Sequence, residues 1–262
     1  MVKYLGKRPR ESARALPGFP LTTKRGRGII IIPAYNESET IGEVVRQIEA
    51  EGLGLDILVV DDGSTDGTGA VLRGLPVTTV SHPINLGYGA AVQTGMLYAA
   101  REGYDLLVMM DGDGQHVPGE IRKLLEGLET GVDIVIGSRF LAGSESYRIP
   151  VFRRFAIRFF SLLAKTLGGV DIRDVTSGFQ AMRRDVFLFL AREYPVDFPD
   201  AEVIIMLGLK KFRVLEVPTV FRQREQGTSM YSSVGTVLYY PFKSFLASVI
   251  VLLRLIRERK GS

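Results

Sequence analysis

The sequence contains no cysteine and only two histidines, His82 and His116, among its 262 residues. The first absence excludes disulfides, zinc–thiolate sites and thiol catalysis, and the second excludes a metal site built from several imidazoles. No P-loop, G-x-x-x-x-G-K-[ST], is present, and no G-x-G-x-x-G follows the first predicted strand, which argues against P-loop nucleotide chemistry and dinucleotide binding. The hydrophobic content of 46% and charged content of 24% are ordinary for a globular protein.

Positive charge is concentrated at the N-terminus. Residues 1–28 contain eight Lys and Arg against one acid, Glu11, so this arm carries +7 and leaves −3 for the rest of a chain whose net charge is +4. Such an arm suits an acidic partner, either lipid headgroups or nucleic acid, or serves only as a solubilising tail. It lacks an apolar h-region, so it is not a secretory signal.

Short apolar runs alternate with helical patterns through the first half of the chain. The runs expected as buried strands lie at 28–32, 56–60, 77–80, 106–110 and 133–136. Between them, apolar residues spaced i, i+3, i+4, i+7 predict helices, one of them capped by Asn36 and another started by Pro118. This alternation is typical of an α/β protein with a doubly wound, mainly parallel sheet and helices on both faces.

Polar clusters follow four of these strands, where open α/β sheets bind their ligands. They are Pro33–Glu37, Asp61–Ser64, Asp111–Asp113 and Gly137–Arg139. In the third, an apolar run ends in two aspartates separated by one glycine. Desolvated carboxylates need a cation, a partner or water, and Mg²⁺ is usually held by one or two carboxylates plus substrate phosphates. The alternative is a simple turn rich in Asp and Gly.

Together these motifs resemble the family 2 glycosyltransferases of the GT-A fold. The motifs are Pro33-Ala-Tyr35-Asn36-Glu37, Val60–Ser64, Asn85-Leu-Gly87, Asp111-Gly-Asp113-Gly-Gln115 and Gly137-Ser-Arg139. Thr176–Phe179, Glu216-Val-Pro218 and Arg224–Ser229 are similar to the polyprenyl-phosphate branch typified by dolichol-phosphate mannose synthase. The resemblance covers residues 28–230 and implies a mixed, mainly parallel GT-A sheet.

The resemblance implies a role for each matching residue. The nucleotide-sugar pocket would be lined by Pro33, Tyr35, Asn36, Glu37, Val60, Asp61, Asp62, Asp111, Gly112 and Asp113, with Val60 and Asp62 at the base. Asp111, Asp113 and Gln115 would hold Mg²⁺ or Mn²⁺. Arg139 and Arg224, catalytic together with the two aspartates, would bind substrate phosphates, and Ser229 would join them at the acceptor phosphate. Arg139 could instead pair with an acid, and Tyr35 could be a core aromatic.

The activity implied is inverting, metal-dependent transfer of a sugar from a GDP- or UDP-linked donor to a polyprenyl phosphate, dolichyl or undecaprenyl. A phosphate nucleophile is already anionic at neutral pH and needs no general base. The alternative within the family transfers to a sugar hydroxyl and needs a base, for which Asp174, Asp200 and Glu202 are candidates. A non-catalytic nucleotide-sugar-binding module is a remote third hypothesis. Met230 stands where relatives commonly have a lysine, so the identity of the sugar does not follow from the resemblance.

Three regions are expected, namely a basic arm at 1–27, the catalytic domain at 28–230 and an apolar, basic C-terminal segment at 231–262. Ser244–Leu253 carries no charge but has only ten residues, whereas a bilayer span takes about 20. We therefore expect an interfacial anchor, or a helix that docks on a small membrane protein. Residues 151–168 mix cations with Phe and Leu, as in a helix at a headgroup boundary or an ordinary amphipathic helix. The enzyme is expected peripherally at the cytoplasmic face of a membrane, with no nucleic-acid partner.

Overall fold

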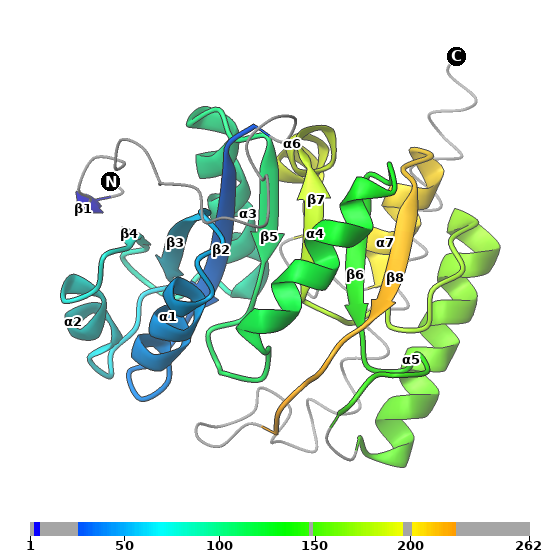
Figure 1. Ribbon diagram of the computed structural model, residues 1–262, viewed down its shortest axis with the longest axis horizontal. Helices are drawn as coiled ribbons and strands as arrows, with labels where there is room; N and C mark the ends of the chain where they lie inside the picture. The colour runs from blue at the N-terminus through cyan, green and yellow to red at the C-terminus, as the bar shows by residue number, and fades with distance from the viewer. Residues whose placement is uncertain (1–2, 6–25, 147–148, 196–200, 224–262) are drawn as a thin grey trace.

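The computed structural model describes residues 3–5, 26–146, 149–195 and 201–223, and its centre is an eight-stranded sheet of order β1-β4-β3-β2-β5-β7-β6-β8 (Figure 1). The strands are β1 (Lys3–Leu5), β2 (Gly28–Ala34), β3 (Asp56–Asp61), β4 (Thr78–Ser81), β5 (Leu106–Met109), β6 (Ile134–Ser138), β7 (Gln180–Arg183) and β8 (Val214–Pro218). Neighbouring strands are parallel except at β1–β4, β5–β7 and β6–β7. Strands β1 and β7 therefore run opposite to the others.

Helices cover both faces of this sheet. In Figure 1, α1 (Ile41–Ala50) and α4 (Ile121–Glu129) lie in front of it, and α3 (Tyr88–Arg101), α6 (Arg184–Glu193) and α7 (Ala201–Leu209) lie behind. The short α2 (Thr68–Arg73) follows β3, and a 3-10 turn (Pro118–Glu120) leads into α4. Helix α5 (Val151–Leu163), continued by a π-helical turn at Ala164–Gly168, stands at the β8 end of the molecule (Figure 1).

Alternate strand residues point to opposite faces, which gives the protein two apolar layers. Ile29 and Ile31 pack in the layer that contains α3 and α6, whereas Ile30 and Ile32 pack in the layer of α1 and α4. All four are at most 1% exposed. The apolar run at 28–32 is thus a strand buried on both faces, as the sequence predicted.

The five strands predicted from the sequence are confirmed, together with the mixed, mainly parallel doubly wound sheet. The apolar pattern did not predict β7, which enters antiparallel between β5 and β6, or the edge strand β8. It also did not predict β1, which lies within the expected basic arm and pairs antiparallel with β4. Residues 6–25 and the C-terminal segment at 231–262 lie outside the described residues.

One edge of the sheet collects the strand ends that matter for function. Because β2, β3, β4, β5, β6 and β8 run in one direction, their carboxyl ends meet at this edge. The polar clusters after β2, β3, β5 and β6 are therefore brought to the same side of the molecule. Within the described ranges, no helix has both the length and the apolar character needed to cross a membrane.

Candidate active site

Asp111 and Asp113 lie on the loop that follows β5, at the edge where the parallel strands end. The Tyr88 hydroxyl, from the first turn of α3, donates a 3.0 Å hydrogen bond to Asp111 Oδ1. The amide of Gln115 donates to Asp113 Oδ1 over 3.0 Å, and Gly114 has a left-handed φ of +77° that favours glycine. Both aspartates are partly exposed, so the loop presents them at the border between the core and solvent.

His116 supports this loop as a neutral ring. It is buried, stacks on Phe179 with ring centroids 4.9 Å apart, and meets the Phe221 ring edge-on at 5.1 Å. Burial lowers the pKa of His116 to about 4, although the charge of Asp113 opposes that shift. The imidazole is therefore uncharged at neutral pH. Because Nδ1 accepts the Asp111 amide at 3.0 Å, the proton is assigned to Nε2, which faces Asp111 Oδ2 at 3.7 Å.

Gly178 brings a second backbone segment against Asp111. A Cβ atom at this position would stand 2.9 Å from the Tyr88 hydroxyl and 3.0 Å from Asp111 Oδ2. Any larger residue would have to displace one of these two groups. The glycine of the Thr176–Phe179 motif is thus explained by its close approach to the aspartate.

The donor atoms of this loop fit a hard divalent cation. Asp111, Asp113 and the Gln115 side chain offer oxygen ligands, which Mg²⁺ and Mn²⁺ prefer. In the part of the chain that the structure describes, no group of three or more His, Cys, Asp or Glu side chains is placed to hold a metal. Two carboxylates are the share that a protein usually contributes to Mg²⁺ when substrate phosphates supply further ligands.

The loop after β2 is locked to the loop after β3. The side-chain oxygen Oδ1 of Asn36 accepts a hydrogen bond from the Thr65 backbone amide at 2.9 Å, and the backbone amide of Asn36 donates to Ser64 Oγ at 3.0 Å. The prediction that Asn36 caps the first helix is wrong, because α1 begins at Ile41 and its N-cap residue is Thr40. Asn36 has a φ of +55°, a left-handed conformation in which asparagine is enriched.

Tyr35 and Glu37 flank Asn36 in this loop. The Tyr35 side chain is not a core aromatic, because the residue is 45% exposed, and such a ring can stack on a base. Glu37 Oε2 accepts the Thr40 hydroxyl at 2.9 Å, and the same hydroxyl lies 3.0 Å from the Gly112 carbonyl oxygen. Glu37 is thereby linked to the loop that carries the two aspartates.

Asp62 has a different surrounding from the one expected of a base contact. It is buried, and Oδ1 accepts the Leu86 amide at 2.9 Å while Oδ2 accepts the Gly87 amide at 2.8 Å. Oδ1 also lies 2.6 Å from His82 Nδ1, and the far nitrogen of that ring lies 3.0 Å from Thr94 Oγ1. Asp62 therefore anchors the loop that leads into α3, and its contact with a nucleotide base stays a prediction.

Three further residues of the predicted nucleotide pocket lie at the ends of β2 and β3. Pro33 and Val60 are buried in these strands, so contacts with a nucleotide there would come from the backbone. Asp61 Oδ1 accepts the Ser64 amide at 3.0 Å, which closes the turn after β3.

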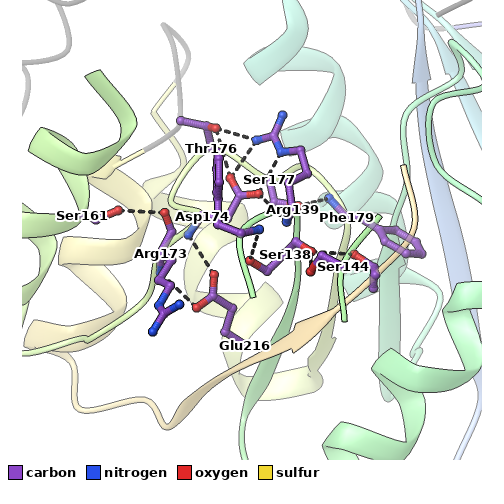
Figure 2. Close-up of polar contacts among 12 residues, drawn as sticks. Ser138, Arg139, Ser144, Ser161, Arg173, Asp174, Thr176, Ser177, Phe179 and Glu216 are labelled. Carbon is purple, nitrogen blue, oxygen red and sulfur yellow. Dashed lines mark hydrogen bonds and ion pairs between the residues drawn. The ribbon is translucent and has the colours of Figure 1, made fainter. Parts of the chain in front are cut away.

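Arg139, predicted to bind a substrate phosphate, forms a buried ion pair with Asp174 (Figure 2). Its Nε and one terminal nitrogen donate to the two carboxylate oxygens at 2.8 and 2.7 Å, and the same terminal nitrogen contacts Thr176 Oγ1 at 2.7 Å. The two side chains are only 6% and 0% exposed. The pair agrees with the alternative that Arg139 pairs with an acid, and its contact with a substrate phosphate stays a prediction.

The same pair bears on the hydroxyl-acceptor alternative. Both oxygens of Asp174 accept hydrogen bonds from Arg139, and the Asp174 amide in turn donates to Glu216 Oε1 at 2.8 Å (Figure 2). A carboxylate engaged in this way is poorly suited to remove a proton from a substrate. Of the other two candidate bases, Glu202 is partly buried in α7, and Asp200 lies outside the described residues.

Arg224 and Ser229, predicted at the acceptor phosphate, also lie outside the described residues. The described chain ends close to the aspartate loop, because the Arg222 amide donates to the Gln115 carbonyl oxygen at 2.8 Å. Phe221 forms an isolated antiparallel bridge with His116. The segment that continues into Arg224 therefore starts beside Gln115.

The sequence interpretation missed two residues of this site. Tyr88 follows the Asn85-Leu-Gly87 motif directly, and its place after a glycine that starts a helix was the available signal. His82 had no expected role, and its pairing with Asp62 joins positions that are distant in the sequence.

The mixed, mainly parallel sheet with helices on both faces has the architecture of the GT-A fold. The fold is shared with glucosyl-3-phosphoglycerate synthase of Mycobacterium tuberculosis, solved with Mn²⁺, uridine diphosphate and glucosyl-3-phosphoglycerate. That comparison has a TM-score of 0.62 and 21% identity, and covers 85% of this chain and 80% of the other.

The chain belongs to glycosyl transferase family 2, whose family model matches residues 29–189, and it is a glycosyltransferase. Polyprenol monophosphomannose synthase of Mycolicibacterium smegmatis is 35% identical over 218 residues, covering 79% of this chain and 81% of that protein. Undecaprenyl-phosphate mannosyltransferase of Micrococcus luteus is 34% identical over 217 residues, covering 79% and 88%.

Proposed function

We propose that this glycosyltransferase moves a sugar from a nucleotide diphosphate sugar to a polyprenyl phosphate at a membrane surface, with Mg²⁺ or Mn²⁺ as cofactor. The observation that carries the proposal is the Asp111–Asp113 loop, which the Tyr88 hydroxyl and the neutral ring of His116 support at the carboxyl edge of the sheet. The relatives named as polyprenyl-phosphate mannosyltransferases support the lipid acceptor.

Residues from the loops after β2 and β5 would bind the nucleotide-sugar donor and the metal. Tyr35 and Glu37 would border the nucleotide, and Asp111 and Asp113 would hold the metal at the diphosphate. A bound divalent cation would neutralise the departing diphosphate as a Lewis acid. Gly178 and Tyr88 would fix the position of Asp111, because transition-state stabilisation depends on groups that are already oriented.

The acceptor needs alignment more than activation. A lipid phosphate is anionic at neutral pH and can attack the anomeric carbon without a base, opposite to the leaving group and hence with inversion. The engagement of Asp174 by Arg139 favours this proposal over a hydroxyl acceptor, because it removes one of the three candidate bases. Arg224 is the proposed ligand of the acceptor phosphate, since a planar guanidinium suits phosphate oxygens.

The test compares labelled GDP- and UDP-sugars with two acceptors, a polyprenyl phosphate and a free sugar. We expect transfer to the lipid phosphate only, loss of transfer in EDTA, and recovery with Mg²⁺ or Mn²⁺. Asp111→Asn and Asp113→Asn should keep the melting temperature and lose both transfer and Mn²⁺ binding measured by calorimetry. Full turnover in chelator would refute the metal assignment, and transfer to the sugar hydroxyl alone would refute the acceptor.

A further inference from the structure

Helix α5 has two apolar faces, and packing within the protein accounts for one of them. Ile157 and Phe160 are each 3% exposed and belong to the apolar layer behind the sheet. Val151, Phe155 and Leu162 are 68%, 64% and 58% exposed. Side chains of this size are costly to leave in water, so the second face calls for an explanation.

These three exposed side chains form a stripe along one side of the helix, and Phe159, which is 47% exposed, lies beside it. At about 100° per residue, Val151, Phe155 and Leu162 fall within an arc of about 40° on the helix surface. Ile157 and Phe160 lie on the opposite side of the same helix. In Figure 1, α5 stands at the β8 end of the molecule, with one long side directed away from the sheet.

Cations run along one border of this stripe. Arg154 and Arg158 are exposed and fall in the arc next to Val151 at the same angular spacing. Residues 151–170 contain Arg153, Arg154, Arg158 and Lys165 and no acid. Lys165, at the C-terminal end, pairs with Asp171 at 2.7 Å. Arg154 and Arg158 are therefore the cations of this border that can attract an anionic surface.

We infer that the outward face of α5 binds the surface of an anionic lipid bilayer. A helix with an exposed apolar stripe beside a row of arginines can place its apolar side chains at the acyl boundary and its guanidinium groups among lipid phosphates. A second copy of the chain is a poorer occupant. A two-fold pairing of this face would bring the same arginines of both copies together on a helix that has no acid to balance them.

Membrane contact by α5 is useful to the enzyme only if its acceptor is a membrane lipid, so this inference rests on the proposed function and adds the surface that would contact the membrane. Ser161 of α5 donates through its hydroxyl to the Arg173 carbonyl oxygen at 3.0 Å (Figure 2). The segment after Arg173 contains Asp174 and leads to Gly178, which borders Asp111. A bilayer bound to α5 would thus lie against a helix that is hydrogen-bonded to the segment leading to the candidate site.

The sequence has no tryptophan, which allows a direct test in the full-length protein. Phe155→Trp introduces one fluorophore into the stripe, and Leu97→Trp places the matched control on α3, at a residue 51% exposed. The probes are vesicles of phosphatidylglycerol with phosphatidylcholine, vesicles of phosphatidylcholine alone, and vesicles that contain brominated lipid. We expect a blue shift and bromine quenching for Phe155→Trp on the anionic vesicles, and neither for Leu97→Trp.

A second pair of variants tests the charges. Arg154→Glu combined with Arg158→Glu should reduce partition into anionic vesicles by at least about tenfold, since each basic residue near an anionic surface contributes about fivefold. Arg73→Glu on α2 is the control and should change partition by about fivefold at most. Unchanged Phe155→Trp emission in protein that sediments with vesicles would overturn the inference. A blue shift without lipid that grows with protein concentration would overturn it in favour of a second copy.

An activity comparison separates this inference from the proposed function. The double arginine variant should transfer at the wild-type rate to a short, water-soluble isoprenoid phosphate and more slowly to polyprenyl phosphate in vesicles. Equal slowing with both acceptors would contradict the membrane role of α5. If the wild type uses neither phosphate, the proposed function fails, while the tryptophan result still decides whether α5 contacts lipid.

Discussion

Replacement of Arg139 by methionine separates a structural role from a phosphate-binding role. The change leaves Asp174, which is 0% exposed, without the guanidinium that donates to both its oxygens. Removing one partner of a buried ion pair costs about 3–5 kcal/mol, because the remaining charge is desolvated and uncompensated. For a domain of this size each kcal/mol lowers the melting temperature by about 2–4 °C, so we expect a drop of about 6–20 °C.

The measurement is urea unfolding followed by circular dichroism, with the donor KM determined below the unfolding transition. Arg139→Met should unfold at lower urea with little change in donor KM. Adding Asp174→Asn should restore about 0.5–3 kcal/mol relative to the single variant, since residues in contact show interaction energies of this order. The reasoning is refuted if Arg139→Met is as stable as the wild type and has lost transfer, which is the result expected of a phosphate ligand.

Three smaller changes test how the site is supported. Tyr88→Phe removes a hydrogen bond to the carboxylate of Asp111, a contact of about 1.5–3 kcal/mol, and should lower kcat/KM by about tenfold or more, with a fall in melting temperature of about 3–12 °C. Asp62→Asn leaves the backbone amide of Leu86 or Gly87 without its carboxylate acceptor, so amide hydrogen exchange in the loop before α3 should become faster. A raised KM for the donor without faster exchange would instead support a contact between Asp62 and the base. Partial burial alone would raise the pKa of Asp66, but hydrogen bonds from Thr68 and Ser38 outweigh it and lower that pKa below its ordinary value. The ionised Asp66 carboxylate therefore stabilises the fold fully above about pH 5, and this contribution is lost progressively as the pH falls below about 4. In Asp66→Asn, the free energy of unfolding measured with urea should fall less between pH 5 and acidic pH than in the wild type. The same fall in both proteins would contradict a lowered pKa at Asp66.

The strands and the aspartate loop could be predicted because their signals are local. The run Ile29–Ile32 is apolar at every position, so it is expected to be buried whatever packs against it. A turn that follows such a run lies at the end of a strand. Strand β7 gave a weaker signal, because Gln180 and Arg183 interrupt its apolar character. It becomes a strand by pairing with β5 and β6 on either side, and such pairings depend on the tertiary fold.

The roles of charged side chains were harder to predict because they depend on distant partners. Arg139 and Asp174 are 35 positions apart, and nothing between them in the sequence indicates that they pair. Asp62 was interpreted as a base contact because its motif matches the family. Its burial against the loop before α3 is set by packing that the motif does not encode. The motifs indicated the loops that gather at the carboxyl edge of the sheet, and they did not indicate which way each side chain points.

These pairings also determine which charged groups the candidate site leaves unmatched. Burial keeps His116 uncharged at neutral pH, so the ring next to Asp111 supports the loop without adding positive charge. The charge of Arg139 is matched by Asp174 within the protein. The proposed metal site on the aspartate loop would therefore not be opposed by a protonated imidazole or an unmatched guanidinium, either of which would repel a bound cation. Under the proposed function, the positive charge that faces a lipid phosphate would then come from a residue other than Arg139, and Arg224 is the proposed one.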